Sequence, residues 1–219
     1  MSLPDIGPGI GNLRFLIVDD QSQIRLLVRT ILFSLGCRDI LEAEHGGDGL
    51  EQINTSKPDI VITDWAMEPI SGIQMVKTLR QSDITAVKYM PVIMLTGFSE
   101  RRRIVSARDA GINEYLLKPV SPKSLFSRIQ AIIEQPRRFV KTTSYFGPDR
   151  RRGKQQFNGP DKRGSGEEGV QMDMNVQLSQ QEIEDEYFMP TESGSFASSE
   201  QYIPPGIRRA QELAKKNRR

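Results

Sequence analysis

The stretch DIVITDWAMEPISG at residues 59–72 is the most informative part of the sequence for both fold and chemistry. Its first part, Asp59–Thr63, is a short apolar run of the kind that forms a buried strand. Asp64 follows directly, and a segment with helical periodicity runs from Ser71 to Gln81. A buried strand that ends in a carboxylate and leads into a helix is typical of an α/β domain with its chemistry at the strand ends.

The same alternation of strand and helix recurs on both sides of this stretch. Four further pairs are Phe15–Val18 with Gln21–Leu35, Ile40–Ala43 with Asp48–Asn54, Pro91–Leu95 with Ser99–Ala110, and Glu114–Leu117 with Ser121–Glu134. The strands are nearly continuous Val/Ile/Leu runs, which are typical of a parallel sheet covered on both faces. The sequence therefore predicts a five-stranded, doubly wound parallel sheet of the α/β class.

Composition excludes several classes of protein. No apolar stretch approaches the roughly 20 residues of a membrane helix, and the start, MSLPDIGPGIGNLR, lacks a basic flank followed by an apolar run. The single cysteine, Cys37, has no partner for an internal disulfide, and with the single His45 it makes no zinc-ligand set. We expect an unprocessed cytoplasmic protein without membrane insertion.

The formal net charge of +2 hides a segregation along the chain. Residues 1–133 carry 15 acidic and 15 basic side chains, whereas 136–165 carry nine Lys/Arg against two Asp. Residues 166–200 carry nine acids and no base, and 201–219 carry six bases against one acid. Such blocks indicate a solvated tail. We expect a disordered N-terminus at 1–12, a folded domain at 13–135, and a low-complexity, largely disordered charged tail at 136–219 with short helices at 179–188 and 205–217.

Polar residues stand at the carboxyl ends of three predicted strands and just after a fourth. These residues are Asp19, Asp20, Asp64, Thr96 and Lys118. Strand ends converge in a doubly wound sheet, so three carboxylates, a hydroxyl and an ammonium are expected to share one cleft. Clustered carboxylates require a cation, and Mg²⁺ suits oxygen ligands and a phosphoryl group. Asp64 is then a carboxylate nucleophile that forms an acyl phosphate.

Four motifs carry a resemblance to a known family: FLIVDDQSQIR, DIVITDWAMEPISG, VIMLTG and YLLKP, in this order. Over about residues 14–134 the chain resembles the receiver domains of two-component response regulators, most of all the single-domain chemotaxis type. The resemblance implies the flavodoxin-like form of the predicted sheet. It also implies a signalling switch rather than an enzyme, with a sensor histidine kinase as donor and a flagellar motor switch or other motility complex as output partner.

The resemblance further implies a role for each site residue. Asp64 is the phospho-acceptor, and Thr96 and Lys118 contact the phosphoryl group. Asp20, Asp64 and the backbone carbonyl of Ala66 bind Mg²⁺, and Asp19 assists through water. Tyr115 forms the switch with Thr96, and the Lys118–Pro119 bond is cis. The chain departs from many relatives in its apolar Ala66 and Phe98, which flank the phosphoryl group and predict a longer-lived acyl phosphate.

Two other functions remain open. The first alternative is a phosphate sink or adaptor whose tail is only a linker. The second is a phosphohydrolase of the haloacid dehalogenase type, which also uses an aspartate nucleophile at a strand end. The hydrolase normally has a second Asp two residues after the nucleophile, where this chain has Ala66. Steady turnover of an external phosphate ester would favour it.

The basic block contains a short repeat, Gly147–Arg151 and Gly159–Arg163, each copy preceded by an aromatic residue. Asp and Arg together suit guanine edges and phosphates. The block is similar to the arginine-rich extension of chemotaxis-like receivers that bind cyclic di-GMP. The candidate nucleotide-binding residues are Tyr145, Asp149, Arg150, Arg151, Arg152 and Arg163. The acidic block downstream argues against general nucleic-acid binding.

Overall fold

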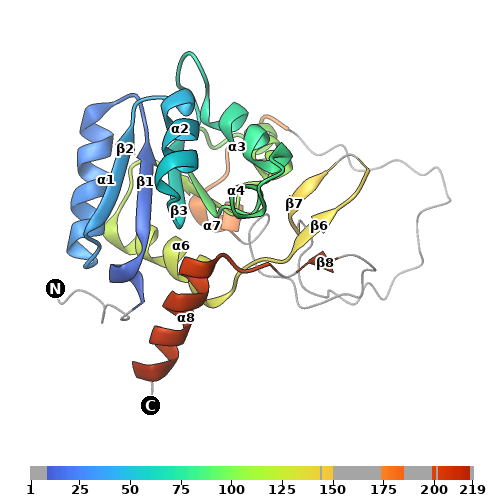
Figure 1. Ribbon diagram of the computed structural model, residues 1–219. Coiled ribbons are helices and arrows are strands. Elements are labelled where there is room, and N and C mark those ends of the chain that lie inside the picture. Colours follow the sequence, from blue (N-terminus) through green and yellow to red (C-terminus); the bar gives the residue numbers. More distant parts are fainter. Residues whose placement is uncertain (1–8, 144, 150–173, 185–198, 201, 218–219) are drawn as a thin grey trace, which may run out of the picture.

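The computed structural model describes residues 9–143, 145–149, 174–184, 199–200 and 202–217 (Figure 1). Its centre is a five-stranded parallel sheet in the order β2-β1-β3-β4-β5. The strands are β1 (Arg14–Val18), β2 (Asp39–Ala43), β3 (Ile60–Asp64), β4 (Val92–Thr96) and β5 (Glu114–Leu117). The helices between and after them are α1 (Ser22–Ser34), α2 (Gly46–Ser56), α3 (Gly72–Gln81), α4 (Thr85–Lys88), α5 (Arg101–Ala110) and α6 (Pro122–Glu134). The predicted doubly wound α/β fold is confirmed.

Two apolar cores lie on opposite faces of the sheet, because successive strand residues point to opposite sides. Phe15 and Ile17 belong to the core that also holds the buried faces of α1 and α6. Leu16 and Val18 belong to the core beneath α2, α3 and α5. β1, β3 and β4 therefore lie between helices on both faces, which explains their continuous apolar sequences.

Local signals define most helix ends. Ser71 and Gln74 form a capping box at the start of α3, and Ser121 and Ser124 form another at the start of α6. Gly36 follows α1 with φ of 82°, and Gly111 follows α5 with φ of 95°, a backbone region that favours glycine. The short helix α4 has no counterpart among the predicted elements.

The structure corrects the expectation of disorder for the end of the N-terminal segment. Residues Ile10–Asn12 form a 3₁₀ helix, η1, and Ile10 is buried. The reason is a partner far along the chain: α8 (Pro205–Asn217) packs against η1 and α6, with Ile207 and Ala210 in the same core. Residues 1–8 lie outside the described residues. α8 covers the range over which a tail helix is expected.

Other described tail segments also contact the domain. The strands β6 (Phe139–Lys141), β7 (Phe146–Pro148) and β8 (Ser199–Glu200) form a small antiparallel sheet beside the domain (Figure 1). Phe139, Phe146 and Tyr202 surround the ring of Tyr89, with centroids 4.7–5.1 Å from it. Much of the expected disordered tail, 150–173 and 185–198, lies outside the described residues. Within the described ranges, no helix is long and apolar enough to cross a membrane.

The expected tail helix at 179–188 corresponds in part to α7 (Gln180–Ile183). Ser179 and Glu182 form the capping box at its start, as the sequence predicts. Residues 185–188 of the expected helix lie outside the described residues. α7 lies near β5, at the edge of the main sheet.

Candidate functional site

Three of the predicted strand-end residues, Asp19, Asp64 and Lys118, meet at one edge of the sheet. The ammonium Nζ of Lys118 lies 2.7 Å from Oδ1 of Asp64 and 2.9 Å from Oδ2 of Asp19. These side chains come from the loops and ends of three different strands, β1, β3 and β5. Asp19 and Asp64 are buried, and Asp20 is exposed. The Lys118–Pro119 bond is cis, as predicted, and Glu68–Pro69 is a second cis bond.

Backbone groups orient the two buried carboxylates. The amide of Ala66 donates to Oδ2 of Asp64 at 2.8 Å, and the amide of Gln21 donates to Oδ1 of Asp19 at 2.9 Å. Gly72 passes so close to this strand end that a Cβ there would lie 1.9 Å from the carbonyl oxygen of Asp64. Only glycine therefore allows α3 to begin directly against the Asp64 backbone.

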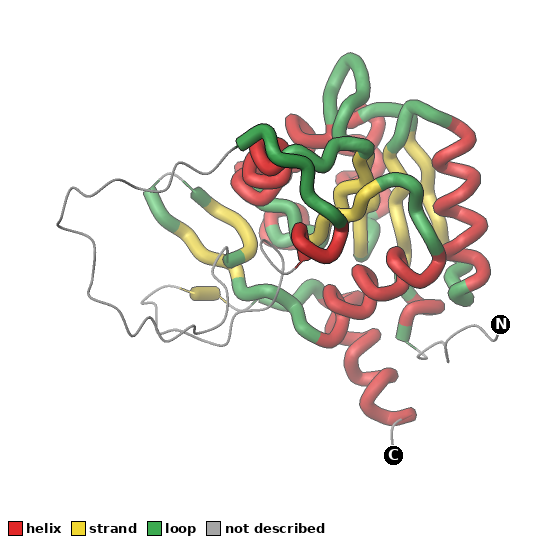
Figure 2. The backbone as a smooth tube through the Cα atoms, turned by 180° about the vertical axis from the view of Figure 1, so that it is seen from behind, coloured by secondary structure: helices red, strands yellow, loops and turns green. Residues whose placement is uncertain are grey.

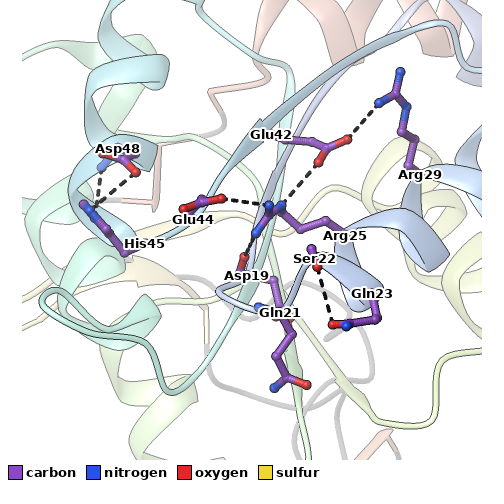
Figure 3. Close-up of polar contacts among 10 residues, drawn as sticks. All are labelled: Asp19, Gln21, Ser22, Gln23, Arg25, Arg29, Glu42, Glu44, His45 and Asp48. Carbon is purple, nitrogen blue, oxygen red and sulfur yellow. Dashed lines mark hydrogen bonds and ion pairs between the residues drawn. The ribbon is translucent and has the colours of Figure 1, made fainter.

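Arg25 of α1 contacts the loop after β1 and holds it against β2 (Figure 3). Its guanidinium donates to the carbonyl of Asp19 at 2.8 Å and pairs with Glu42 at 3.2 Å and Glu44 at 3.0 Å. Glu42 lies in β2, so this network ties α1 and β2 to the loop that carries Asp19 and Asp20. Sequence reasoning gave Arg25 no role, because its partners lie up to 19 residues away.

Burial and charge pairing act in opposite directions on the pKa values of the site residues. Desolvation raises the pKa of Asp19, although the hydrogen bond from Lys118 acts to lower it. Burial acts to lower the pKa of Lys118, but its contacts with Asp64 and Asp19 outweigh this effect and raise it. Lys118 therefore stays protonated at neutral pH, and it is the cation that offsets the two carboxylates.

Thr96 and Tyr115 are linked to the site through the loop after β4. The Thr96 hydroxyl accepts from the amide of Phe98 at 3.1 Å, and the hydroxyl of Tyr115 donates to the Phe98 carbonyl at 2.7 Å. Burial raises the pKa of Tyr115, whose hydroxyl also interacts with Thr96. Both side chains are fully buried, so Tyr115 already points inward in this structure.

An aromatic cover lies beside the strand ends. Trp65, the residue after Asp64, meets the ring of Phe98 edge-on at 6.2 Å. The guanidinium of Arg103 stacks 3.8 Å from the centroid of Phe98 and 5.7 Å from that of Trp65. Arg103 belongs to α5, so this helix reaches over the side chains that flank the site.

The residues present suit a magnesium ion. Within the described residues, no three His, Cys, Asp or Glu side chains form a complete metal site by themselves. Mg²⁺ needs no such cage, because it keeps several waters and binds through one or two carboxylates and a phosphoryl oxygen. Asp19 and Asp64 are both buried, and both pair with Lys118. Two carboxylates beside one ammonium leave a net negative charge, which suits a magnesium ion.

Comparisons with known proteins agree with this geometry. Residues 15–130 match the family model of the response regulator receiver domain. The chain belongs to this family. Over 122 residues it is 33% identical to the chemotaxis protein CheY1 of Helicobacter pylori, covering 55% of this chain and 97% of that protein. Over 124 residues it is 35% identical to CheY-3 of Vibrio cholerae, covering 57% and 94%.

Solved structures give the same result for the fold. The chemotaxis protein CheY4 of Vibrio cholerae superposes with a TM-score of 0.51 at 27% identity, covering 55% of this chain and 98% of that one. The receiver domain of the Francisella response regulator 1452 gives 0.50 at 28% identity, covering 55% and 95%. This receiver is thus similar to chemotaxis regulators and acts in phosphorylation-dependent signalling. Its tail lies outside the matched family model.

The structure describes only two of the six candidate nucleotide-binding residues. The hydroxyl of Tyr145 donates to the carbonyl of Pro148 at 2.7 Å, and the amide of Asp149 donates to the carbonyl of Arg138 at 2.7 Å. Tyr145 and Asp149 also interact electrostatically with the partly buried Arg137. Arg150, Arg151, Arg152 and Arg163 lie outside the described residues.

Proposed function

We propose that this receiver accepts a phosphoryl group on Asp64 from a histidine kinase in the cytoplasm and changes the affinity of its output face for a protein partner. The observation that carries the proposal is the contact of the Lys118 ammonium with both Asp64 and Asp19 at the carboxyl end of the sheet. A buried carboxylate beside a fixed cation is prepared to receive a dianionic group, because the cation offsets the added charge.

The chemistry follows from this arrangement. A carboxylate oxygen of Asp64 attacks the phosphorus of a phosphohistidine, an O–P bond forms, and the P–N bond breaks as the imidazole leaves with the electron pair. Lys118 and Thr96 contact the phosphoryl oxygens. Asp20, Asp64 and the carbonyl of Ala66 would hold Mg²⁺, with Asp19 assisting through water. The ion supplies charge neutralisation for the transferred group.

Labelling with a small phosphodonor tests the acceptor. We expect radiolabelled acetyl phosphate with Mg²⁺ to label the full chain once per molecule, and chelation of Mg²⁺ to abolish the labelling. Asp64→Asn should remove the label, whereas Asp83→Asn, an exposed loop position, should retain it. Equal labelling of the Asp64→Asn chain would refute the assignment. Many turnovers of an external phosphate ester would instead support the hydrolase alternative.

The output partner is proposed from the relatives, which are chemotaxis proteins. A receiver that acts on a flagellar motor switch or another motility complex binds that partner more tightly when phosphorylated. A phosphate sink needs to bind only the kinase. Capture of a motor-switch protein by the phosphorylated chain, but not by Asp64→Asn, separates these two outputs.

A second ligand, cyclic di-GMP, is proposed for the arginine-rich tail. The observation that favours it is that Tyr145, just before β7, and Asp149, just after β7, both interact electrostatically with the cationic Arg137. Arg150, Arg151 and Arg152 follow immediately in the sequence and supply forked donors for guanine edges and phosphates.

Calorimetry tests this ligand in the full chain. We expect cyclic di-GMP to bind the unmodified chain and a control with Arg208, Arg209 and Lys215 changed to Ala, all exposed on α8. Binding should weaken at least tenfold when Arg150, Arg151 and Arg152 are changed to Ala. No heat from the unmodified chain would leave the tail without this role.

A further inference from the structure

A segment of the tail lies across the first turn of α5 and the edge strand β5. We call residues Met174–Glu184 the strap. Figure 2 shows the loop that leads into the short helix α7 within this segment. The strap lies beyond the residues that match the family model, so the receiver family does not account for it.

The strap completes the amino end of α5 through backbone hydrogen bonds. Helix α5 begins at Arg101, and its N-cap residue Glu100 makes no side-chain capping bond. The amide of Arg101 instead donates to the carbonyl of Val176 at 3.0 Å, and the amide of Arg102 donates to that of Met174 at 3.0 Å. First-turn amides of a helix have no partner within the helix, so the strap satisfies two groups that would otherwise need water or another ligand.

The strap also pairs with the edge of the main sheet. The side chain of Gln180 accepts from the amide of Leu117 at 2.7 Å and donates to the carbonyl of Tyr115 at 3.0 Å. β5 is an edge strand, and Gln180 occupies one donor and one acceptor of its open side. A peptide that binds by adding to a sheet edge uses the same groups.

Apolar and charged side chains hold the strap in place. Leu178 and Ile183 are buried and belong to the same core as Tyr115 and Ile104. Oε2 of Glu184 lies 2.7 Å from a guanidinium nitrogen of Arg128 on α6. The surface under the strap therefore offers apolar contacts to two side chains, a backbone edge to one side-chain amide and a cation to one carboxylate.

We propose that the strap is a tethered ligand: it fills a peptide-binding groove on the α5–β5 face, and a protein that binds this face displaces it first. This inference rests on the proposed function, because it takes the α5–β5 face as the face that binds the output partner. Backbone contacts at Ser99 and Tyr115 place the strap against the loop and strand that follow Thr96. The groove fits an acidic peptide with two apolar side chains and an amide between them.

A disulfide tests whether the strap occupies the groove. Glu100 and Gln177 face each other as an antiparallel bridge pair, at a spacing that a disulfide spans. We expect Glu100→Cys with Gln177→Cys to crosslink under mild oxidation at least tenfold faster than a control pair, Glu51→Cys with Gln177→Cys, because Glu51 lies on α2. The native Cys37 is buried. Equal rates for the two pairs would overturn the proposal.

A labelled peptide tests whether the strap blocks a second ligand. The probe is fluorescein-labelled MNVQLSQQEIE, the sequence of the strap. We expect the peptide not to bind the oxidised, crosslinked chain and to bind it once reductant is added. We also expect the peptide to bind the Gln180→Ala chain at least tenfold more tightly than the Gln130→Ala chain, a surface control on α6. Equal binding by the oxidised and reduced chains would contradict the blocking role.

Neither assay uses a phosphoryl group, and both should give the same result with Asp64→Asn. Failure of the strap therefore leaves the phospho-acceptor assignment standing, and failure of Asp64 labelling leaves the strap standing. Exchange of the Leu117 amide is a further measurement on folded protein. It should accelerate at least tenfold in Gln180→Ala and stay unchanged in Gln130→Ala.

Discussion

At the scale of single residues, we predict that the side chains near Asp64 and Thr96 set how easily water reaches an acyl phosphate on Asp64. The ring of Phe98 contacts both Trp65 and Arg103, and Ala66 has no polar side chain. We predict that Phe98→Glu and Ala66→Asn shorten the lifetime of the phosphoryl group several-fold, because each can orient an attacking water. The decay of radiolabel after removal of the donor measures this. Decay times unchanged from those of the original chain would contradict the prediction.

Glu114 gives a prediction about pH at the same scale. Burial raises its pKa to about 7, although Arg137 and Arg128 act to lower it. The folded chain then holds a proton that the unfolded chain releases near its ordinary pKa, so this contribution to stability is present at low pH and is lost as pH rises toward 7. Unfolding by urea should show a loss of up to about 3 kcal/mol across this range.

The substitution Glu114→Gln isolates this effect. The amide does not titrate. The free energy of unfolding of the variant should therefore change less between pH 5 and pH 7.5 than that of the original chain. Glu51→Gln, exposed on α2, is the matched control and should keep the original pH dependence. A Glu114→Gln profile that overlays the original would show that Glu114 stays ionised in the folded state.

The residues of the site were predictable because each follows a strand that its own sequence identifies. The strand run before Asp64 and the one before Thr96 place both residues at the same edge of any parallel sheet. The contacts of Gln180 with β5 were not predictable, because the partners lie 63 and 65 residues apart and no local pattern links them. The metal ligands and the four tail arginines stay predictions.

At the scale of elements, α8 is held by its contacts with the domain rather than by its own sequence. Ile207 is fully buried, and Gly206 lies so close to Asp59 that a Cβ would meet its carboxylate at 1.8 Å. We predict that Ile207→Ala lowers the free energy of unfolding by about 2–5 kcal/mol. Lys215→Ala, exposed on the same helix, should change it by no more than about 0.5 kcal/mol. Denaturant titration followed by circular dichroism measures both, and equal effects would show that α8 is not docked.

The main strands and helices were predictable as elements, whereas docking of the tail was not. Continuous apolar runs identify β1, β3 and β4 because helices cover both of their faces. The tail has few apolar residues, and its composition indicates a solvated chain. Phe139, Leu178 and Ile207 are buried nevertheless, because each enters a core or an aromatic cluster that the earlier residues provide. Composition counts such residues but does not show where they lie.

At the scale of the whole molecule, the domain and the described tail segments form joint cores. η1 and α8 extend the core beneath α1 and α6, and the strap extends the core beneath α5. The curated relatives match only 55–57% of the chain, so this arrangement adds to what they share. The described tail segments of this chain are therefore in part structural, because their buried side chains belong to the cores of the domain.

Removal of the tail therefore has a thermodynamic consequence. A chain that ends at Gln135 loses the buried side chains of Leu178, Ile183 and Ile207, each of which contributes about 1.5–3 kcal/mol before the entropy of ordering the tail is subtracted. We predict a lower denaturant midpoint for the shortened chain and a smaller slope, because less surface becomes exposed on unfolding. Trp65 fluorescence and circular dichroism should give one transition in the full chain, with coincident midpoints. An unchanged midpoint would mean that the tail contacts add no net stability. Displacement of the strap by a partner would then require little free energy.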